Sequence, residues 1–279
     1  MRAAVPSSYH QAEPRSEEAH HEGQRAAGMA DKPRDPAMSV WLTPPKRKKR
    51  GSAPTGLSRE RIIDTAVALL DSEGIDAFSM RRLAAELDVT PMSVYWYVDS
   101  KDDLLELALD AAFGTMKVPP LEDHGDWRRH VYVMAHEYRK CYLEHPWAAE
   151  MVGRYLSVGP NAMLLSSSVM SALSGTGLTG DALAGAVALV FQFAYGVAMA
   201  ESMWARRVRQ QEGDEDTVYR QMQDMLSEHD SRFTVWEQQF GYDRRQDFAS
   251  ARNRQFDQGL EMALAGIEAA IAALPKGHG

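Results

Sequence analysis

Four helix-start signals follow one another within about forty residues, and they restrict this part of the chain to short helices joined by tight turns. They are Ser58, Ser79, Thr90 and Ser100. Each side chain can accept a hydrogen bond from the first turn of a helix, and a run with apolar residues at helical spacing follows each one. Gly74 and the pair Asp88–Val89 mark the ends between them. The signals predict a first helix that ends at Gly74, a second over 80–87, a very short third through 92–97, and a fourth that starts at Ser100.

The rest of the chain also has the pattern of helices. Apolar residues recur three and four positions apart, and no segment shows the alternation expected of a half-buried strand. The predicted fold class is therefore all-α. A length of 279 residues favours two domains, and 44% apolar residues can supply their cores.

The third predicted helix has a composition that suits contact with nucleic acid. Two short helices separated by a tight turn and supported by a longer one form the unit that places a helix in the major groove. The outward positions Thr90, Met92, Ser93, Tyr95 and Tyr97 carry no negative charge, as base edges and phosphates require. The alternative is that the aromatic residues at 95–97 belong to the core.

The run from Leu57 to Leu109, and above all the segment SVYWYVDSKDDLL, resembles the DNA-binding domain of the TetR family. The resemblance implies a homodimer on a near-palindromic operator, usually a repressor that a small-molecule effector releases. Arg81 matches an arginine that reads a base, and Lys101 matches a lysine that contacts phosphate. Pro91 and Met92 depart from the pattern of the tetracycline repressor, so this chain is not expected to recognise the operator sequence of that repressor. The predicted DNA-binding residues are Ser79, Arg81, Arg82, Thr90, Met92, Ser93, Tyr95, Trp96, Tyr97 and Lys101.

The charge of the chain is unevenly distributed. Residues 58–116 carry five Lys or Arg against twelve Asp or Glu, whereas residues 1–57 carry ten against six. Residues 1–55 lack apolar periodicity and are predicted to be a disordered basic extension. Its run Lys46–Arg50 suits a flexible arm that follows phosphates, with a solvated charge run as the alternative. Met29 and Met38 are plausible alternative translation starts.

The predicted domains are the extension 1–55, a three-helix helix-turn-helix DNA-binding domain over 56–118, and a larger helical ligand-binding and dimerisation domain over 119–279. The segment Trp127–Trp147 resembles the start of the regulatory domain of tetracycline-repressor-type members, with Pro146 ending its helix. A long helix is predicted from a cap at Asp181 to about Arg207, and a final helix over about 254–274. By analogy with the family, these two helices from each subunit form a four-helix dimer interface. Small residues on the last helix suit close packing, either against the partner or within the chain: Gly259, Ala263, Gly266 and Ala270.

An effector pocket would lie among the helices of the larger domain. Candidate lining residues are methionines and aromatics, which adapt to large apolar ligands but also serve as ordinary core. They are Met151, Tyr155, Met170, Phe191, Tyr195, Met199 and Trp204. No cofactor and no metal are predicted, because the spacing of His130 and His136 does not place both on one helical face. The single cysteine, Cys141, is expected to be a buried structural thiol of a cytoplasmic protein.

The sequence gives less support to functions other than DNA binding. Gly175, Gly177 and Gly180 spell a dinucleotide-binding motif, but no strand precedes them, so they are interpreted as a flexible connection. The chain is not expected to be an enzyme, and no apolar run long enough to span a membrane is seen. An all-α enzyme and a constitutive DNA-binding protein without an effector remain as alternatives.

Overall fold

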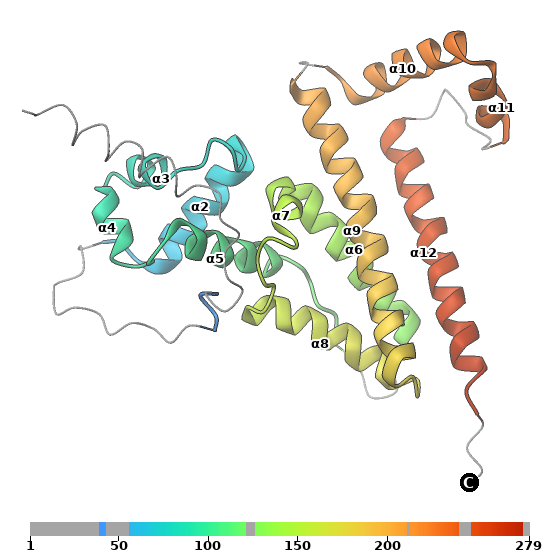
Figure 1. Ribbon diagram of the computed structural model, residues 1–279, viewed down its shortest axis with the longest axis horizontal. Coiled ribbons are helices and arrows are strands. Elements are labelled where there is room, and N and C mark those ends of the chain that lie inside the picture. The colour runs from blue at the N-terminus through green and yellow to red at the C-terminus, as the bar shows by residue number, and fades with distance from the viewer. Residues whose placement is uncertain (1–38, 43–55, 121–125, 211–212, 240–246, 276–279) are drawn as a thin grey trace, which may run out of the picture. The chain divides into compact units, whose positions relative to one another are not determined.

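The computed structural model describes residues 39–42, 56–120, 126–210, 213–239 and 247–275 (Figure 1). Within these residues the regular elements are helices, which confirms the all-α fold class. The helices of the first part are α2 (Arg59–Glu73), α3 (Met80–Glu86), α4 (Pro91–Tyr95) and α5 (Lys101–Phe113). Those of the larger part are α6 (Trp127–Glu144), α7 (Pro146–Met151), α8 (Pro160–Ser174), α9 (Gly180–Gln210), α10 (Glu215–His229), α11 (Ser231–Gln239) and α12 (Phe248–Ala272).

The predicted helix starts in the first part are confirmed. The hydroxyls of Ser58, Ser79, Thr90 and Ser100 accept hydrogen bonds from backbone N–H groups three residues on, at 3.0–3.3 Å. Gly74 follows α2 with a φ of +79°, which a glycine adopts without strain. Asp88 has a φ of +55° in the α3–α4 turn, and this conformation makes the turn tight.

Two helices of the larger part begin earlier than the sequence predicts. The predicted cap Asp181 lies inside the first turn of α9, which starts at Gly180. The last helix, α12, starts at Phe248, six residues before the predicted start. Its cap is Asp247, whose carboxylate accepts from the Ser250 N–H at 2.7 Å. The first turns of α12 have no apolar periodicity, and they are held by the stacking of Phe248 on Tyr219 of α10, with ring centroids 4.0 Å apart.

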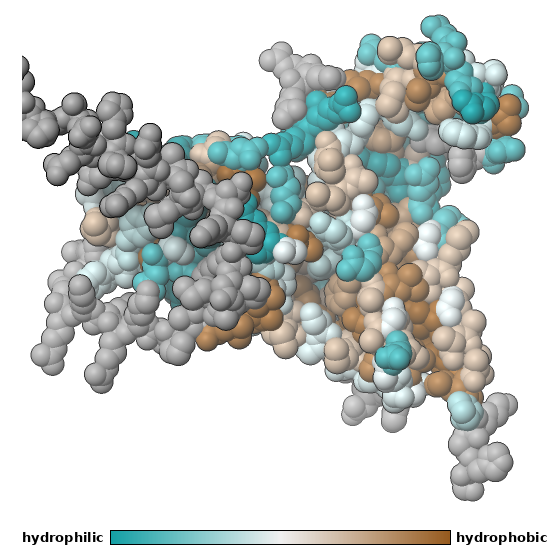
Figure 2. Space-filling model, viewed as in Figure 1, coloured by the Kyte–Doolittle hydropathy of each residue, from teal (hydrophilic) through white to brown (hydrophobic). Residues whose placement is uncertain are grey.

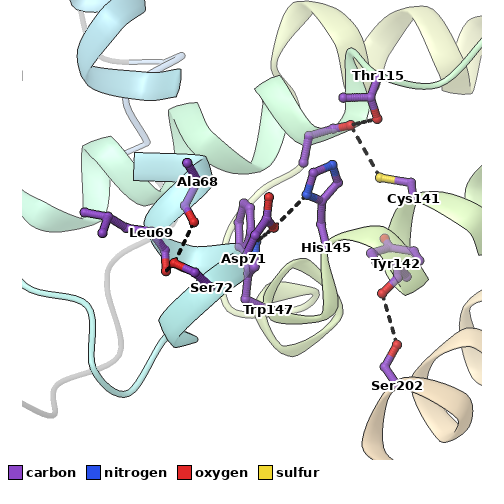
Figure 3. A network of polar contacts seen from close by, with 11 residues as sticks. Ala68, Leu69, Asp71, Ser72, Thr115, Cys141, Tyr142, His145, Trp147 and Ser202 are labelled. Carbon is purple, nitrogen blue, oxygen red and sulfur yellow. Dashed lines mark hydrogen bonds and ion pairs between the residues drawn. The ribbon is translucent and has the colours of Figure 1, made fainter. Parts of the chain in front are cut away.

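Carboxylates of α2 and α5 bind groups of the larger part. The Asp71 carboxylate lies 2.8 Å from the His145 Nδ1 and accepts from the Trp147 indole N–H at 2.6 Å (Figure 3). The Asp102 carboxylate accepts from the Tyr155 hydroxyl at 2.7 Å. These bonds fasten α2 and α5 to α7 and to the turn that follows it.

A third carboxylate, that of Asp110 on α5, covers the start of α8. It accepts from the Ala162 N–H at 3.0 Å, and from the Asn161 N–H at 3.3 Å and amide at 3.0 Å. An anion is favourable at this position because the first N–H groups of a helix lack intrahelical partners. On the outside, Arg206 of α9 lies 2.7 Å from both Asp76, in the α2–α3 connection, and Glu150 of α7.

The core of the larger part lies where α6, α9 and α12 meet. Arg139 of α6 and Glu201 of α9 form a buried ion pair there, through Nε at 2.9 Å and Nη2 at 2.7 Å. Gly259 of α12 faces Phe193 so closely that a Cβ would lie 2.6 Å from the ring. Cys141 is buried as predicted: its thiol donates to the Ala112 carbonyl at 3.4 Å, and burial raises its pKa to about 12 (Figure 3).

Four residues of the predicted disordered extension have a defined structure. Ser39–Leu42 form a turn against α5, where the Ser39 hydroxyl and the Val40 N–H donate to the Glu106 carboxylate at 2.8 and 2.9 Å. The Trp41 ring packs over Gly159, at which a Cβ would collide with it. These four residues depart from the predicted disorder because the buried Glu106 carboxylate of α5 accepts two of their hydrogen bonds and Trp41 packs over Gly159, the N-cap of α8. The basic run Lys46–Arg50 lies outside the described residues.

Candidate nucleic-acid interface and ligand pocket

The helix-turn-helix exposes a compact set of side chains on α3 and α4. Arg81 is exposed on α3, and among the described residues no ion pair engages it. On α4, Met92 is 77% exposed and Tyr95 42% exposed, although both are large side chains. Val94 between them is fully buried and holds the short helix to the core. Arg81, Met92 and Tyr95 are therefore free to contact another molecule.

Three of the predicted DNA-binding hydroxyls help to form the helices that carry this face. Ser79 caps α3 and Thr90 caps α4 through their side-chain oxygens. The Ser93 hydroxyl lies 3.0 Å from the Thr90 hydroxyl. All three side chains are at least partly exposed. A serine or threonine cap retains further hydrogen-bonding capacity, so contact of these residues with DNA stays a prediction.

Other predicted DNA-binding residues are turned toward the protein. Arg82 lies 2.7 Å from Glu73 and 2.8 Å from Glu86, and thus joins α2 to α3. The half-buried Tyr97 donates its hydroxyl to the Leu57 carbonyl at 2.6 Å. Trp96, the C-cap of α4, is also half-buried. Arg82 and Tyr97 therefore have structural roles that need no DNA, and contact of all three residues with DNA stays a prediction.

Lys101 is at the start of α5, as the predicted phosphate contact requires, but its ammonium group donates to the Phe78 carbonyl at 2.7 Å. Burial lowers its pKa, and the nearby Arg154 charge adds to this effect. An ammonium group has three donors, so this hydrogen bond leaves others for a phosphate.

The larger part contains a cavity of about 620 Å³ among α9, α10, α11 and α12. This volume is within the usual range for small-molecule sites. We call it the α9–α12 pocket. Its aromatic lining includes Phe193, Trp204, Tyr219, Phe233, Trp236 and Phe248.

Of the seven predicted ligand-binding residues, Trp204 lines this pocket. Phe191 and Tyr195 belong instead to an aromatic cluster with Tyr138 and Tyr142, with ring centroids 4.8–5.7 Å apart. The remaining four lie elsewhere: Met151 and Tyr155 are buried, Met199 is half-buried and Met170 is exposed. The structure does not bring the seven residues together.

The α9–α12 pocket also has polar groups that the sequence reasoning missed. Arg252 of α12 pairs with Glu215 through Nη2 at 2.8 Å, while its Nε and Nη1 are buried without an acceptor among the described residues. The Trp204 Nε1 is likewise buried and has no acceptor among the described residues. The density of aromatic residues between 193 and 256 was the available signal, but their convergence depends on how four helices fold together.

No group of three or more His, Cys, Asp or Glu side chains in the described part of the chain is arranged to hold a metal ion. His130 and His136 have separate partners: the His130 Nε2 lies 2.7 Å from the Ser168 hydroxyl, and the His136 Nε2 lies 3.0 Å from the Asp257 carboxylate. Gly175, Gly177 and Gly180 lie at the connection between α8 and α9, with no strand before them in the described residues.

Comparison with known proteins gives two family matches. The model described as tetracyclin repressor-like, C-terminal domain, matches residues 119–271. The model of bacterial regulatory proteins of the tetR family matches residues 62–108. An HTH-type transcriptional regulator from Saccharopolyspora erythraea is 37% identical over 166 residues, which are 60% of this chain and 69% of the relative. The HTH-type transcriptional repressor DrrR1 of Streptomyces coeruleorubidus is 35% identical over 162 residues, 58% of this chain and 59% of that repressor's length.

Solved structures agree with these matches. The Streptomyces coelicolor TetR family protein ActR, in a crystal structure with actinorhodin, has a TM-score of 0.62 and 29% identity. The similarity covers 77% of this chain and 98% of that one. The exposed helix-turn-helix, the larger helical part and both family matches lead to one assignment: the chain belongs to the TetR family of DNA-binding transcriptional regulators.

Proposed function

We propose that this protein is a cytoplasmic repressor that binds a near-palindromic operator as a homodimer and is released by a small-molecule effector. The observation that carries the proposal is the α3–α4 face, on which Arg81, Met92 and Tyr95 are exposed while the residues beside them are buried or paired. The repressor DrrR1 and the complex of ActR with actinorhodin support repression and ligand binding by analogy.

The direct test is selection of bound DNA from a random pool by the full chain. We expect enrichment of a near-palindrome, since each subunit of a dimer reads one half-site. Failure to enrich any palindrome would overturn the proposal. A matched pair then tests the reading face: Arg81→Ala should cost about 1–3 kcal/mol and relax the preference at one base position. Arg82→Ala should keep that preference, because Glu73 and Glu86 already hold the Arg82 side chain.

A homodimer would cover an exposed apolar stripe on α9 and α12. Gly185, Leu189, Gly196 and Met203 share one face of α9 by helical spacing and are all exposed. The corresponding face of α12 includes Met262, which is 72% exposed. Figure 2 shows brown and pale surface along both helices. By length and composition α9 would also suit a membrane span. In its most apolar 18-residue stretch, 22% of the residues are buried within the chain, so most of this apolar surface is left uncovered. A second copy of α9 and α12 would cover this surface and form the four-helix interface typical of the family.

Two glycines of α12 separate the intersubunit role from the intrachain role. At Gly266, no atom lies within 4 Å of an added Cβ, so Gly266→Leu should weaken the dimer without unfolding the chain. Gly259 faces Phe193 of the same chain, so Gly259→Leu should displace that ring and destabilise the fold of the single chain. Ala272, exposed about a third of a turn around α12 from Gly266, provides the control Ala272→Leu. Sedimentation of the three variants measures both effects, and an unchanged dimer in Gly266→Leu would count against this interface.

We assign the effector to the α9–α12 pocket, which is large enough for a drug-sized molecule. An effector must bind the DNA-free state more tightly than the DNA-bound state, because only differential affinity shifts an equilibrium. A constitutive DNA-binding protein is the second candidate function. Thermal melting of the free protein against a compound library distinguishes the two, since a ligand stabilises the fold that binds it.

A further inference from the structure

The α9–α12 pocket has three buried N–H donors without an acceptor among the described residues. They are the indole Nε1 of Trp204 and the Nε and Nη1 of Arg252. An unpaired buried donor destabilises a protein, and most buried polar groups in folded proteins are paired. A site that leaves three such donors together on the wall of one cavity is therefore suited to a ligand that brings acceptors.

The guanidinium of Arg252 is held in place without using all of its donors. Its Nη2 lies 2.8 Å from the Glu215 carboxylate, and its central carbon lies 4.5 Å from the centroid of the Phe248 ring. Phe248 in turn stacks on Tyr219, with an angle of 25° between the ring planes. The stack and the single carboxylate fix the cation while its other edges remain available. Such a preformed group loses little entropy when a ligand binds.

The shape of the lining favours flat rings. Trp204 meets Phe248 and Tyr219 nearly edge to face, with centroids 5.6 and 6.2 Å apart. Phe193 also lines the pocket, and its ring is stacked on that of the buried Phe256, with centroids 5.4 Å apart. Another aromatic ring gains free energy when it stacks on such rings or meets them edge to face.

The carboxylates of the pocket lining do not favour a cation. Glu201 is neutralised by two hydrogen bonds from Arg139, at 2.9 and 2.7 Å. Glu237 of α11 is half-buried and already engaged in an interaction within the chain. Glu215, just outside the lining, is paired with Arg252. Among the charged groups of the described lining, the Arg252 donors are unused while the carboxylates are engaged, so the charge of this site favours an acid over a cation.

We infer that the α9–α12 pocket binds a flat, fused-ring aromatic acid, with its rings among Trp204, Phe248 and Phe193 and its acidic oxygens on Arg252. This ligand assignment rests on the proposed function in one respect, namely that the pocket is the effector site. Carbonyl oxygens elsewhere on the ring system would meet the Trp204 N–H.

The test uses the full chain without DNA and titrates it calorimetrically with anthraquinone-2-carboxylate. Proflavine, a three-ring cation with amino donors, is the comparison ligand. Arg252→Met should weaken binding of the carboxylate about tenfold or more, because a charged hydrogen bond is lost. Arg232→Met is the matched control, since Arg232 is exposed, pairs with Asp230 and does not line the pocket. Trp204→Phe should weaken binding severalfold through loss of the N–H.

A further variant distinguishes loss of the Arg252 contact from loss of folding. Glu215→Gln removes the carboxylate that competes for Arg252, so it should tighten binding of the acid severalfold, a change that misfolding does not produce. Equal affinity of Arg252→Met and the wild type, equal affinity for proflavine, or no binding of the acid at millimolar concentration would each overturn the inference.

These results can be distinguished from failure of the proposed function. Binding of the acid without release from selected DNA would leave the ligand class standing and refute release by this pocket. Release of DNA by a compound of another class, with no binding of the acid, would leave the regulator standing and refute the ligand class.

Discussion

Breaking the Arg139–Glu201 ion pair should destabilise the protein far more than breaking an exposed pair on the same helix. Both side chains are less than 10% exposed, and two hydrogen bonds join them. Glu201→Ala leaves a buried guanidinium without its carboxylate, with its central carbon 4.6 Å from the centroid of the Phe256 ring. Removing one partner of a buried pair costs about 3–5 kcal/mol. We expect a loss of this size in the free energy of unfolding.

The control is Arg128→Ala, also on α6. Arg128 pairs with Glu261 and Glu268, whose side chains are 47% and 64% exposed. Exposed pairs contribute about 0–1 kcal/mol. Urea unfolding followed by circular dichroism, at one fixed protein concentration because a dimer's stability depends on it, measures both variants.

A double variant separates the charge effect from packing. Arg139→Met with Glu201→Leu removes both charges and fills the space with apolar side chains. Such replacements of buried pairs are often neutral or stabilising. We therefore expect the double variant to be more stable than Glu201→Ala alone. The reasoning is refuted if Glu201→Ala costs no more than Arg128→Ala, or if the double variant is as unstable as the single one.

Four further outcomes are expected. Tyr95→Ala should weaken operator binding with unchanged thermal stability, because the side chain is 42% exposed on α4; an equal loss in both would place it in the core. Glu106→Ala should release residues 39–42 from α5, seen as faster proteolysis there and unchanged cutting elsewhere. Arg206→Ala removes the ion pairs from α9 to α7 and to the α2–α3 connection, and should reduce ligand-driven DNA release while leaving ligand affinity unchanged. Burial lowers the pKa of His130, so the unfolded chain takes up its proton first as the pH falls through 6.5, and stability should decrease there; His130→Asn should make this acid limb shallower in pH-dependent melting.

The helices of the first part could be predicted because their signals are local. Each cap bonds to an N–H three residues away, and the tight turn at Asp88 is contained within its own neighbours. The roles of Arg82 and Tyr97 could not be predicted in the same way. Their partners Glu73 and Leu57 lie 9 and 40 residues away in the sequence, and the fold alone brings them into contact.

The ligand pocket could not be predicted from the sequence either, because it depends on contacts between residues that are distant in the chain. Its wall comes from four helices, and a stripe of apolar side chains does not reveal which of them face a cavity. Phe191 and Tyr195 were as plausible as Trp204 by residue type, yet they pack into a cluster with α6. Arg252 was missed because the predicted start of the last helix lay after it, although Asp247 with Ser250 was a readable cap.

The acidic balance of residues 58–116 is explained by where its carboxylates are used. Those of Asp71, Asp76, Asp102, Glu106 and Asp110 bind groups of the larger part or of the Ser39–Leu42 turn. On the α3–α4 side, Glu86 is paired with Arg82 and Asp88 forms the turn.

The negative charge therefore serves to attach the rest of the chain, and the face that carries Arg81 has few acids of its own. It also has few cations among the described residues, since Arg82 is paired and Lys101 is partly engaged. Because the salt dependence of DNA binding follows the number of cations that neutralise phosphates, this face alone should bind DNA with a shallow salt dependence. A steep dependence in the full chain would then point to cations outside this face, and residues 46–50, with five consecutive Lys and Arg, are the densest such run; deleting them should flatten the dependence.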